Sequence, residues 1–366
     1  MASNDVAYMN SPLVSVVMVT CNVEHFLAEA IESILGQTFK DFEFIIVDFG
    51  SVDRSKAIAQ SYAIGDARIR LHEIRNCGLA DARNASCLLA RGRYIAIMDA
   101  DDVSLPDRLS REIDFMNAHP EVGVLGGDTE WIDAAGKSFR VERFPTDDRA
   151  IRAVLPAGCA FCQPTVLIRK EAFDLVGGYR KAFVFAEDCD LWLRMAEHFQ
   201  LANLGQVVLK YRSHPHQVQL RKARQQSLCI LAAQASASSR KNGNADPLAS
   251  VEEITPAVLV AMGVSEATQR INADRDVIRA LNLAGDYSNS LKTAMEALQS
   301  PDWEFAESWQ LAETWLIVAR HYWKQGRFAR SFFAAGRAFI TRPVIAGRPL
   351  KPFLRWVRFP TEASGR

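Results

Sequence analysis

The run Val14-Ser-Val-Val-Met-Val-Thr20 is rich in β-branched residues and predicts a buried β-strand. A helical pattern follows it at once, with apolar residues on one face and Gly36 as the C-terminal stop. The alternation continues, with strands expected over residues 42–47, 69–74 and 94–98 and helices over residues 54–62 and 79–90. This order predicts an α/β domain with a mainly parallel sheet, in which ligands bind beyond the carboxyl ends of the strands.

The character of the chain changes after residue 211. Residues 218–240 are helical in composition, and residues 239–247 form a polar segment rich in helix breakers. From residue 251 to 340 only helical periodicity remains. The sequence therefore predicts an α/β domain over residues 11–220, a helix and linker over 221–250, a smaller all-α domain over 251–345, and a basic, aromatic tail over 346–366.

The helical segment contains two expected helix pairs. One covers residues 273–298 and is broken at Gly285, and the other covers residues 309–340 and is broken at Gly326. Small residues at Ala319, Ala334 and Ala338 would let paired helices pack closely, as in a tetratricopeptide repeat. A plain helical bundle fits the same pattern, so both alternatives stay open.

Composition excludes several classes of protein. The 43 basic and 43 acidic residues give no net charge, so a global positive field for nucleic acid is absent and no nucleic-acid partner is expected. The seven cysteines are odd in number and scattered, which favours a reducing compartment over a disulfide framework. The sequence contains no apolar run of about 18 residues, and residues 1–10 lack the basic and apolar regions of a signal peptide, so we expect none. We therefore expect a cytoplasmic protein.

Three carboxylates follow the strand expected at residues 94–98, namely Asp99, Asp101 and Asp102. Their mutual repulsion would be costly without a counterion, and a hard divalent cation such as Mg²⁺ would remove that cost. The cation would also bridge the phosphates of a substrate. The alternative is a solvated acidic turn that leads into Pro106 and the next helix.

Polar residues also follow the first two strands. Thr20 and Asn22 come after the first, where they could simply cap the next helix. After the second strand, Gly50, Ser51 and Asp53 have a structural explanation as a tight turn and a helix start. That explanation leaves out Asp48, which is well placed to accept hydrogen bonds from a ribose or a base.

A fourth polar cluster lies near residue 190. It contains Glu187, Asp188 and Asp190, directly before the apolar positions of a predicted helix. A helix cap explains one acid but not three. A carboxylate with a raised pKa beside a bound substrate could act as a general base.

Together these residues resemble the inverting, GT-A-fold glycosyltransferases of family 2. The likeness runs from about residue 14 to 214 and rests on seven blocks in the family's order. These blocks are Ser15-Val-Val-Met-Val-Thr-Cys-Asn22 with Ser33-Ile-Leu-Gly-Gln-Thr-Phe39, Phe44-Ile-Ile-Val-Asp48-x-Gly-Ser51, Asn76-x-Gly78 with Ala82-Arg-Asn84, Asp99-Ala-Asp101-Asp102, Pro106-x-Arg108-Leu109, Gly177-Gly-Tyr179 with Glu187-Asp188-x-Asp190, and Tyr211-Arg-x-His214.

The resemblance implies a nucleotide-sugar donor bound by the first half of the domain and a glycan or lipid-linked acceptor bound by the second. It implies donor contacts from Thr20, Asn22, Asp48, Phe49, Arg83 and Asp99, and a Mn²⁺ or Mg²⁺ site formed by Asp101, Asp99 and His214. Asp188 matches the family's catalytic base, and Glu187 and Asp190 are candidates for acceptor contacts. Arg83 and His214 have structural alternatives, as a helix-surface residue and as a buried histidine.

Two features set this chain apart within the family. The family usually carries a second acid before the Gly-Ser pair, and Phe49 stands in that place, where its ring could stack on the base. The donor nucleoside therefore stays open. The Gln-x-x-Arg-Trp signature of processive synthases is absent, since Pro352 precedes Arg355-Trp356 where the glutamine would be. We therefore expect one transfer per acceptor.

Two other functions fit parts of the pattern. A sugar nucleotidyltransferase would also use paired aspartates and Mg²⁺, although residues 20–24 are not the glycine-rich, basic phosphate loop of such enzymes. A degenerate transferase domain could serve as a binding scaffold, which Phe49 favours and Asp99, Asp101 and Asp188 oppose.

The C-terminal residues depart from the neutrality of the whole chain. Residues 321–366 contain ten Lys or Arg and one acid, with eight Phe or Trp among them. Basic residues mixed with aromatics suit an anionic membrane surface. We expect this segment to hold the protein on the inner face of a membrane, with a helical cap of core aromatics and solvated arginines as the alternative.

Overall fold

The computed structural model describes residues 11–156, 158, 160–214 and 218–343. The chain forms two compact units, one made of the residues up to 217 together with 229–255, and the other of residues 218–228 and those from 256 onward. The segment 221–250, expected as a helix and linker, is therefore divided between the two units. The predicted tail at 346–366 lies outside the described residues.

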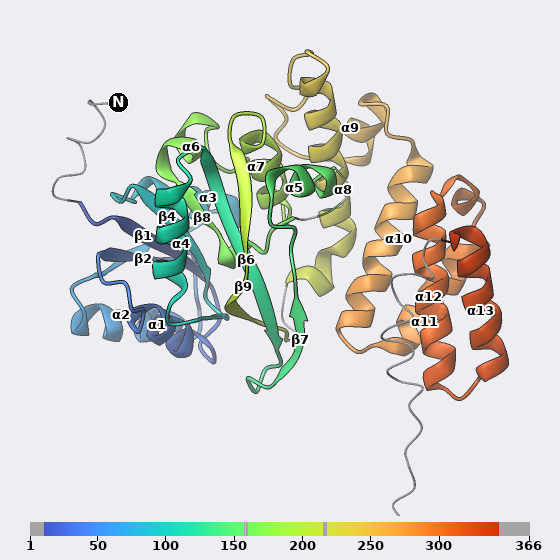
Figure 1. Ribbon diagram of the computed structural model, residues 1–366, viewed down its shortest axis with the longest axis horizontal. Helices are drawn as coiled ribbons and strands as arrows, with labels where there is room; N and C mark the ends of the chain where they lie inside the picture. Colours follow the sequence, from blue (N-terminus) through green and yellow to red (C-terminus); the bar gives the residue numbers. More distant parts are fainter. Residues whose placement is uncertain (1–10, 157, 159, 215–217, 344–366) are drawn as a thin grey trace, which may run out of the picture. The chain divides into compact units, whose positions relative to one another are not determined.

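A nine-stranded mixed sheet forms the centre of the first unit (Figure 1). Its first part has the order β3-β2-β1-β4 with parallel pairing throughout, as the sequence predicts. These strands are β1 (Val14–Thr20), β2 (Phe42–Asp48), β3 (Ile69–Glu73) and β4 (Tyr94–Asp99). The α/β class is confirmed.

Antiparallel pairs enter the sheet beyond β4, in the order β8-β6-β9-β5, with β7 paired to β6. The strands are β5 (Val103–Ser104), β6 (Val122–Ile132), β7 (Ser138–Glu142), β8 (Leu167–Arg169) and β9 (Gln200–Arg212). Only β6 and β9 pair in parallel in this part. Because β5 pairs with β9, residues 103–104 lie beside the last residues of β9.

Strand periodicity explains how the sheet is covered. Even-numbered residues of β1 such as Val16 share a core cluster with Leu27 and Ile31 of α1 (Leu27–Leu35). Val17 points to the opposite face, where it lies beside Cys87 of α3 (Leu79–Leu88). Burying a large aliphatic side chain in this way contributes roughly 1.5–3 kcal/mol. The other helices of the unit are α2 (Ser55–Gly65), α4 (Arg108–Ala118), α5 (Asp148–Val154), α6 (Lys170–Leu175) and α7 (Glu187–Met195), with a 3₁₀ turn η2 (Gln163–Thr165).

The second unit is helical throughout its described residues. It contains α9 (Pro256–Ala261), α10 (Glu266–Leu283), α11 (Tyr287–Gln299), η3 (Pro301–Phe305), α12 (Ser308–Lys324) and α13 (Phe328–Thr341). Helix α8 (Val218–Lys241), which has a break at Lys222, is divided between the units, with residues 218–228 in the second and the rest in the first. Both predicted helix pairs are confirmed, with Gly285 and Gly326 at positive φ where the helices end. Whether the pairs are true repeats stays a prediction. Among the described residues, we find no helix with the length and apolarity needed to cross a bilayer.

Candidate active site

The ends of three neighbouring strands meet at one edge of the sheet. Thr20 at the end of β1 is paired in register with Asp48 at the end of β2, and Val19 is paired with Asp99 at the end of β4. Thr20 and Asp48 are both buried. The expectation that polar residues after successive parallel strands gather at one edge therefore holds for these strands.

The loops after β1 and β2 are joined by side-chain hydrogen bonds. The Asn22 amide donates to the Ser51 hydroxyl at 3.2 Å, and the Val52 amide donates to Oδ1 of Asn22 at 2.9 Å. Asn22 has a φ of 55°, a left-handed conformation that asparagine tolerates better than most residues. Ser51 was expected to cap α2, but its hydroxyl is used by Asn22, and Asp53 accepts from the Ser55 amide instead.

Two buried oxygens at this edge have no protein partner within the described residues. Oδ1 of Asp48 accepts from the amides of Gly50 and Ser51 at 3.2 and 3.1 Å, while Oδ2 has none. Oγ1 of Thr20, on the neighbouring strand, also has none. Because buried polar atoms are nearly always hydrogen-bonded, this pair is a natural place for the polar atoms of a ligand. Phe49, next to them, is half-buried.

The three carboxylates of the acidic turn after β4 contact three different residues. Oδ1 of Asp99 accepts from Arg83 at 3.2 Å, and Oδ2 of Asp101 lies 3.0 Å from Nε2 of His214. Asp102 is 1 % exposed, and its Oδ1 accepts from the Arg212 amide at 2.8 Å. Burial, followed by the charges of Asp101 and Asp99, raises the pKa of Asp102 well above its usual range. A solvated acidic turn is therefore excluded.

Arg212, which belongs to the block Tyr211-Arg-x-His214 but was given no role from the sequence, holds this turn in place. Its Nε donates to the carbonyl of Asp101 at 2.8 Å, and Nη2 donates to Glu29 of α1 at 2.6 Å. Its guanidinium lies over the ring of Phe26, 4.8 Å from the centroid, and that ring also contacts His214 at 5.0 Å. These contacts join α1, β9 and the acidic turn. No local pattern in the sequence predicts them.

The predicted metal ligands are partly brought together. Within the described residues no group of three or more His, Cys, Asp or Glu side chains is arranged as a metal site. Asp101 and His214 do lie side by side, while Asp99 is directed to Arg83. Because Mg²⁺ and Mn²⁺ sites at substrate phosphates need only one or two protein carboxylates, Asp101 fits such an ion, and the His214 imidazole lies next to it.

Helix α7 carries the second acidic cluster to the same edge. Arg83 of α3 pairs with Glu187 of α7 as well as with Asp99 of β4, so one buried guanidinium bridges two elements far apart in the chain. Burial raises the pKa of Glu187 and of Asp99, and Arg83 opposes both shifts. The Asp188 charge also raises the pKa of both carboxyl groups.

Asp188 has the environment expected of a base. It is half-buried, and its Oδ1 accepts from the Cys189 amide at 2.8 Å. Burial raises its pKa, with Arg83 acting in the opposite direction. A carboxylate with a raised pKa is a stronger proton acceptor than an ordinary surface aspartate.

Asp190 has a different role from the acceptor contact expected of it. Its carboxylate is 1 % exposed and accepts from Nε of Arg180 and Nε of Arg194, both at 2.9 Å. Arg194 also donates to the carbonyls of Val176 and Gly178 at 2.6 Å each. Asp190 is therefore a structural residue that fixes the start of α7, because both of its oxygens are already held. Glu187, paired with Arg83, is likewise held in an ion pair.

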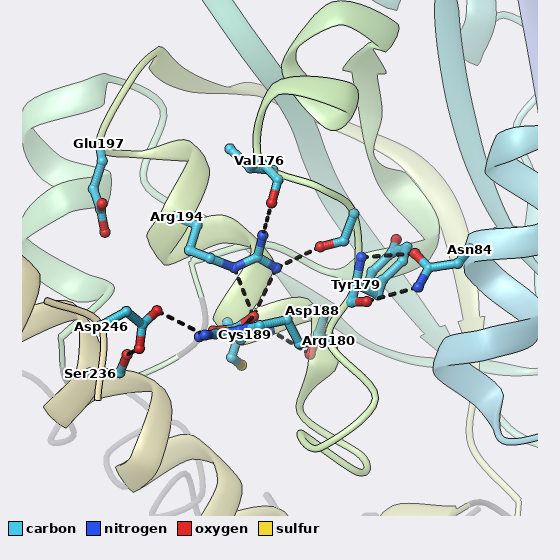
Figure 2. A network of polar contacts seen from close by, with 12 residues as sticks. Asn84, Val176, Tyr179, Arg180, Asp188, Cys189, Arg194, Glu197, Ser236 and Asp246 are labelled. Carbon is cyan, nitrogen blue, oxygen red and sulfur yellow. Dashed lines mark hydrogen bonds and ion pairs between the residues drawn. The ribbon is translucent and has the colours of Figure 1, made fainter. Parts of the chain in front are cut away.

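The network of Asp190 continues to a residue that sequence reasoning missed. Arg180 also pairs with Asp246 at 2.8 Å, as Figure 2 shows, and Asp246 accepts from Ser236 and Arg240 as well. Burial alone would raise the pKa of Asp246, but Ser236, the Leu248 amide and the two arginines lower it to about 2. The sequence indicated only one pair of this network, Asp190 and Arg194, because they are four residues apart on a helix.

Asn84 is also structural. Its side-chain amide donates to the Tyr179 carbonyl and its Oδ1 accepts from the Tyr179 amide, both at 2.8 Å (Figure 2). These two hydrogen bonds fix the loop before α7 against α3. The Asn84 side chain is therefore not directed toward a sugar donor.

The chain resembles known proteins in sequence. The model of the Glycosyl transferase family 2 matches residues 15–177, which ends before α7. An uncharacterized glycosyltransferase of Methanocaldococcus jannaschii is 34% identical over 214 residues, covering 57% of this chain and 73% of that protein. The O-antigen biosynthesis glycosyltransferase WbnJ of Escherichia coli is 30% identical over 207 residues, covering 55% and 80%.

The fold has solved counterparts as well. The mannosyltransferase PcManGT of Pyrobaculum calidifontis, solved in complex with GDP-Man and Mn²⁺, matches with a TM-score of 0.51 at 18% identity, covering 91% of this chain and 89% of that one. At this identity the likeness concerns the fold, and it confirms the GT-A architecture.

Proposed function

The chain belongs to glycosyl transferase family 2 and is a glycosyltransferase, and from this premise we propose that it transfers a sugar from a nucleoside-diphosphate donor to a glycan or lipid-linked acceptor in cell-surface polysaccharide assembly. The observation that carries the proposal is the Arg83 bridge, which joins Asp99 of the strand edge to Glu187 beside Asp188. The Escherichia coli relative, named for O-antigen biosynthesis, supports a surface polysaccharide as the product.

The donor nucleoside would bind at the ends of β1 and β2. Oγ1 of Thr20 and Oδ2 of Asp48 can take part in hydrogen bonds with a ribose or base, and the Phe49 ring offers a stacking surface. Asn22 would act indirectly, because its side chain already joins the two loops. Arg83 and Asp99 would shape the donor side of the site through their ion pair.

Asp101 and His214 are the residues that would hold a Mn²⁺ or Mg²⁺ ion. Bound there, the ion would neutralise the negative charge of the leaving diphosphate. Arg212 holds the backbone carbonyl of Asp101, and the Phe26 ring contacts the His214 ring, which supports a site at this position.

Asp188 would act as the general base in a single inverting displacement. Its carboxylate takes the proton of the acceptor hydroxyl while that oxygen forms a bond to the anomeric carbon. The bond from that carbon to the diphosphate breaks, and the diphosphate leaves with the electron pair. Because the attack comes from the face opposite the leaving group, an α-linked donor gives a β-linked product.

The remaining properties follow from the same proposal. We propose that transfer is non-processive and cytoplasmic, on the sequence features given above. Family membership favours glycosyl transfer over nucleotidyl transfer, and the side-by-side Asp101 and His214 together with Asp188 favour an enzyme over a degenerate scaffold.

The test is a transfer assay with Asp188→Asn. The chain is incubated with Mn²⁺ and a panel of UDP-, GDP- and dTDP-sugars, and release of nucleoside diphosphate is measured. Asparagine keeps the shape but cannot accept the proton, so we expect unchanged donor affinity and a rate lower by about 10²–10⁴-fold. The matched control is Asp174→Asn, a half-exposed aspartate of α6 paired only with Lys170 among its described contacts.

Three results would contradict parts of this proposal. Near wild-type turnover in Asp188→Asn would remove Asp188 as the base. A product with the donor's anomeric configuration, measured by NMR coupling constants, would exclude the inverting mechanism. If no donor in the panel binds in calorimetry, the scaffold alternative is favoured instead.

A further inference from the structure

Helix α13 packs into its unit with small residues and leaves its large apolar residues outside. Ser331, Ala334 and Ala338 are buried, and the Ser331 hydroxyl donates to the Ala319 carbonyl of α12 at 2.7 Å. The large residues of α13 are exposed: Phe328 51%, Phe332 62%, Phe333 64%, Phe339 51% and Ile340 77%. We call these five residues the aromatic face of α13.

The aromatic face is continuous. At roughly 100° per residue, its five members fall within an arc of about 140°, opposite the three buried small residues. Single exposed apolar residues are ordinary, but a contiguous group of large ones marks an interaction surface. Phe328 and Phe332 contact Trp323 of α12 and Phe333 contacts Trp315, yet all five residues of the face stay more than half exposed.

Positive charge surrounds the aromatic face. Residues 314–343 contain six Lys or Arg and not one Asp or Glu. Arg330 and Arg337 are exposed on the border of the arc, and their guanidinium groups lie 5.8 Å from the Tyr322 ring and 5.3 Å from the Trp315 ring. Arg327 and Arg342 flank the two ends of the helix.

This charge decides among the possible occupants of the face. The last residues of the chain, 344–366, carry five Lys or Arg against one Glu, a balance of 5 − 1 = +4, so they would be repelled by it. A second copy would bring the same cations against it. A partner has to be both anionic and apolar, and an anionic lipid bilayer combines these properties, with phosphates at its surface and acyl chains directly beneath.

We propose that the aromatic face of α13 binds an anionic lipid bilayer. The phenylalanines and Ile340 insert at the boundary between headgroups and acyl chains, and Arg330 and Arg337 contact the lipid phosphates. This surface belongs to the described residues and does not depend on the tail. It also does not depend on the proposed catalytic role of Asp188, so either proposal can fail without the other.

The test is co-sedimentation of the full chain with vesicles of phosphatidylcholine, with and without phosphatidylserine. We expect binding to the anionic vesicles at low salt, weaker binding at high salt, and little binding to neutral ones. The variant Phe332→Ser/Phe333→Ser should weaken binding by at least tenfold. The variant Arg330→Gln/Arg337→Gln should weaken it by about 25-fold, at about 5-fold per cation.

A matched control is available on the first unit. Phe139 and Val141 of β7 are exposed to 58% and 48%, and the variant Phe139→Ser/Val141→Ser removes two similar side chains elsewhere. It should bind vesicles like the wild type. Circular dichroism and nucleotide binding of all variants report that the fold is kept.

Several outcomes would overturn the proposal. Absence of binding to anionic vesicles by the wild type would do so, as would equal loss in the β7 control and the α13 variant. If light scattering shows a dimer that Phe332→Ser/Phe333→Ser dissociates, the face is an interface between copies. If the cationic variant loses affinity for RNA but keeps its affinity for vesicles, the partner is a nucleic acid.

Discussion

Replacement of Arg83 by methionine is expected to damage both the stability of the first unit and its response to pH. Arg83 is the shared counterion of Glu187 and Asp99, and the Glu187 side chain is only 3% exposed. Removing one partner of a buried ion pair costs about 3–5 kcal/mol of unfolding free energy. In a domain of this size each kcal/mol lowers the melting temperature by about 2–4 °C, so we expect a fall of roughly 6–20 °C.

The pH dependence of this loss has a definite sign. Burial already raises the pKa values of Glu187 and Asp99 in the folded state, and Arg83 restrains both shifts. Without Arg83 these values rise further above those of the unfolded chain. The folded variant then binds more protons than the unfolded chain between the two values, so its unfolding free energy falls as pH rises through that window. The deficit relative to wild type should therefore be larger at about pH 8 than at about pH 5.

Urea unfolding of both proteins at the two pH values measures this difference. The matched control is Arg54→Met, which removes an arginine that is 79% exposed and paired with Glu24 at the surface. Surface ion pairs contribute little, so the control should melt like the wild type at both pH values. A deficit in Arg83→Met that is the same at both pH values, or no greater than that of the control, would refute the reasoning.

Three further perturbations give separate tests. Asp101→Asn should weaken Mn²⁺-dependent binding of a nucleoside diphosphate in calorimetry, as should His214→Ala, and an unchanged affinity in either variant would remove that residue from the proposed metal pair. Asp246→Asn should lower kcat about tenfold or more with little change in the donor KM, because it loosens the anchor of α7 without touching the donor side; a change in KM alone would argue against a positioning role. Gly92→Ala should destabilise the fold by about 1–3 kcal/mol, because its Cβ would lie 2.6 Å from the Ser15 backbone nitrogen, whereas Gly65→Ala, with open space around it, should not.

Local sequence patterns determined most of the first half of the fold. The limits of β1 match the predicted run Val14–Thr20, and β2 and β4 each extend one residue beyond prediction, to Asp48 and Asp99. These strands are continuous apolar runs bounded by polar residues, which is a signal carried by neighbours in the chain. Gly285 and Gly326 likewise marked the ends of helices because a positive φ is a local property of the backbone.

The same logic located the edge of the sheet where the site lies. In parallel strands joined by helices, all carboxyl ends point the same way, so acids that follow successive strands converge without knowledge of any contact. Asp48, Asp99 and Asp101 could therefore be identified from their positions alone. The sequence could not say which of them would be held by protein partners and which would face a ligand.

Tertiary structure alone decided those partners. Arg83 meets Glu187 across 104 positions of sequence, Asp101 meets His214 across 113, and Arg180 meets Asp246 across 66. Pairs at such separations depend on the order of β8, β6 and β9 in the sheet and on the path of α7 and α8, which short-range propensities do not encode. Asp190 shows the consequence. Because it lies two residues from Asp188 in the sequence, it was expected to contact the acceptor. In the fold, two arginines bind both of its oxygens, because a buried carboxylate needs a cationic partner and tertiary packing decides which cation that is.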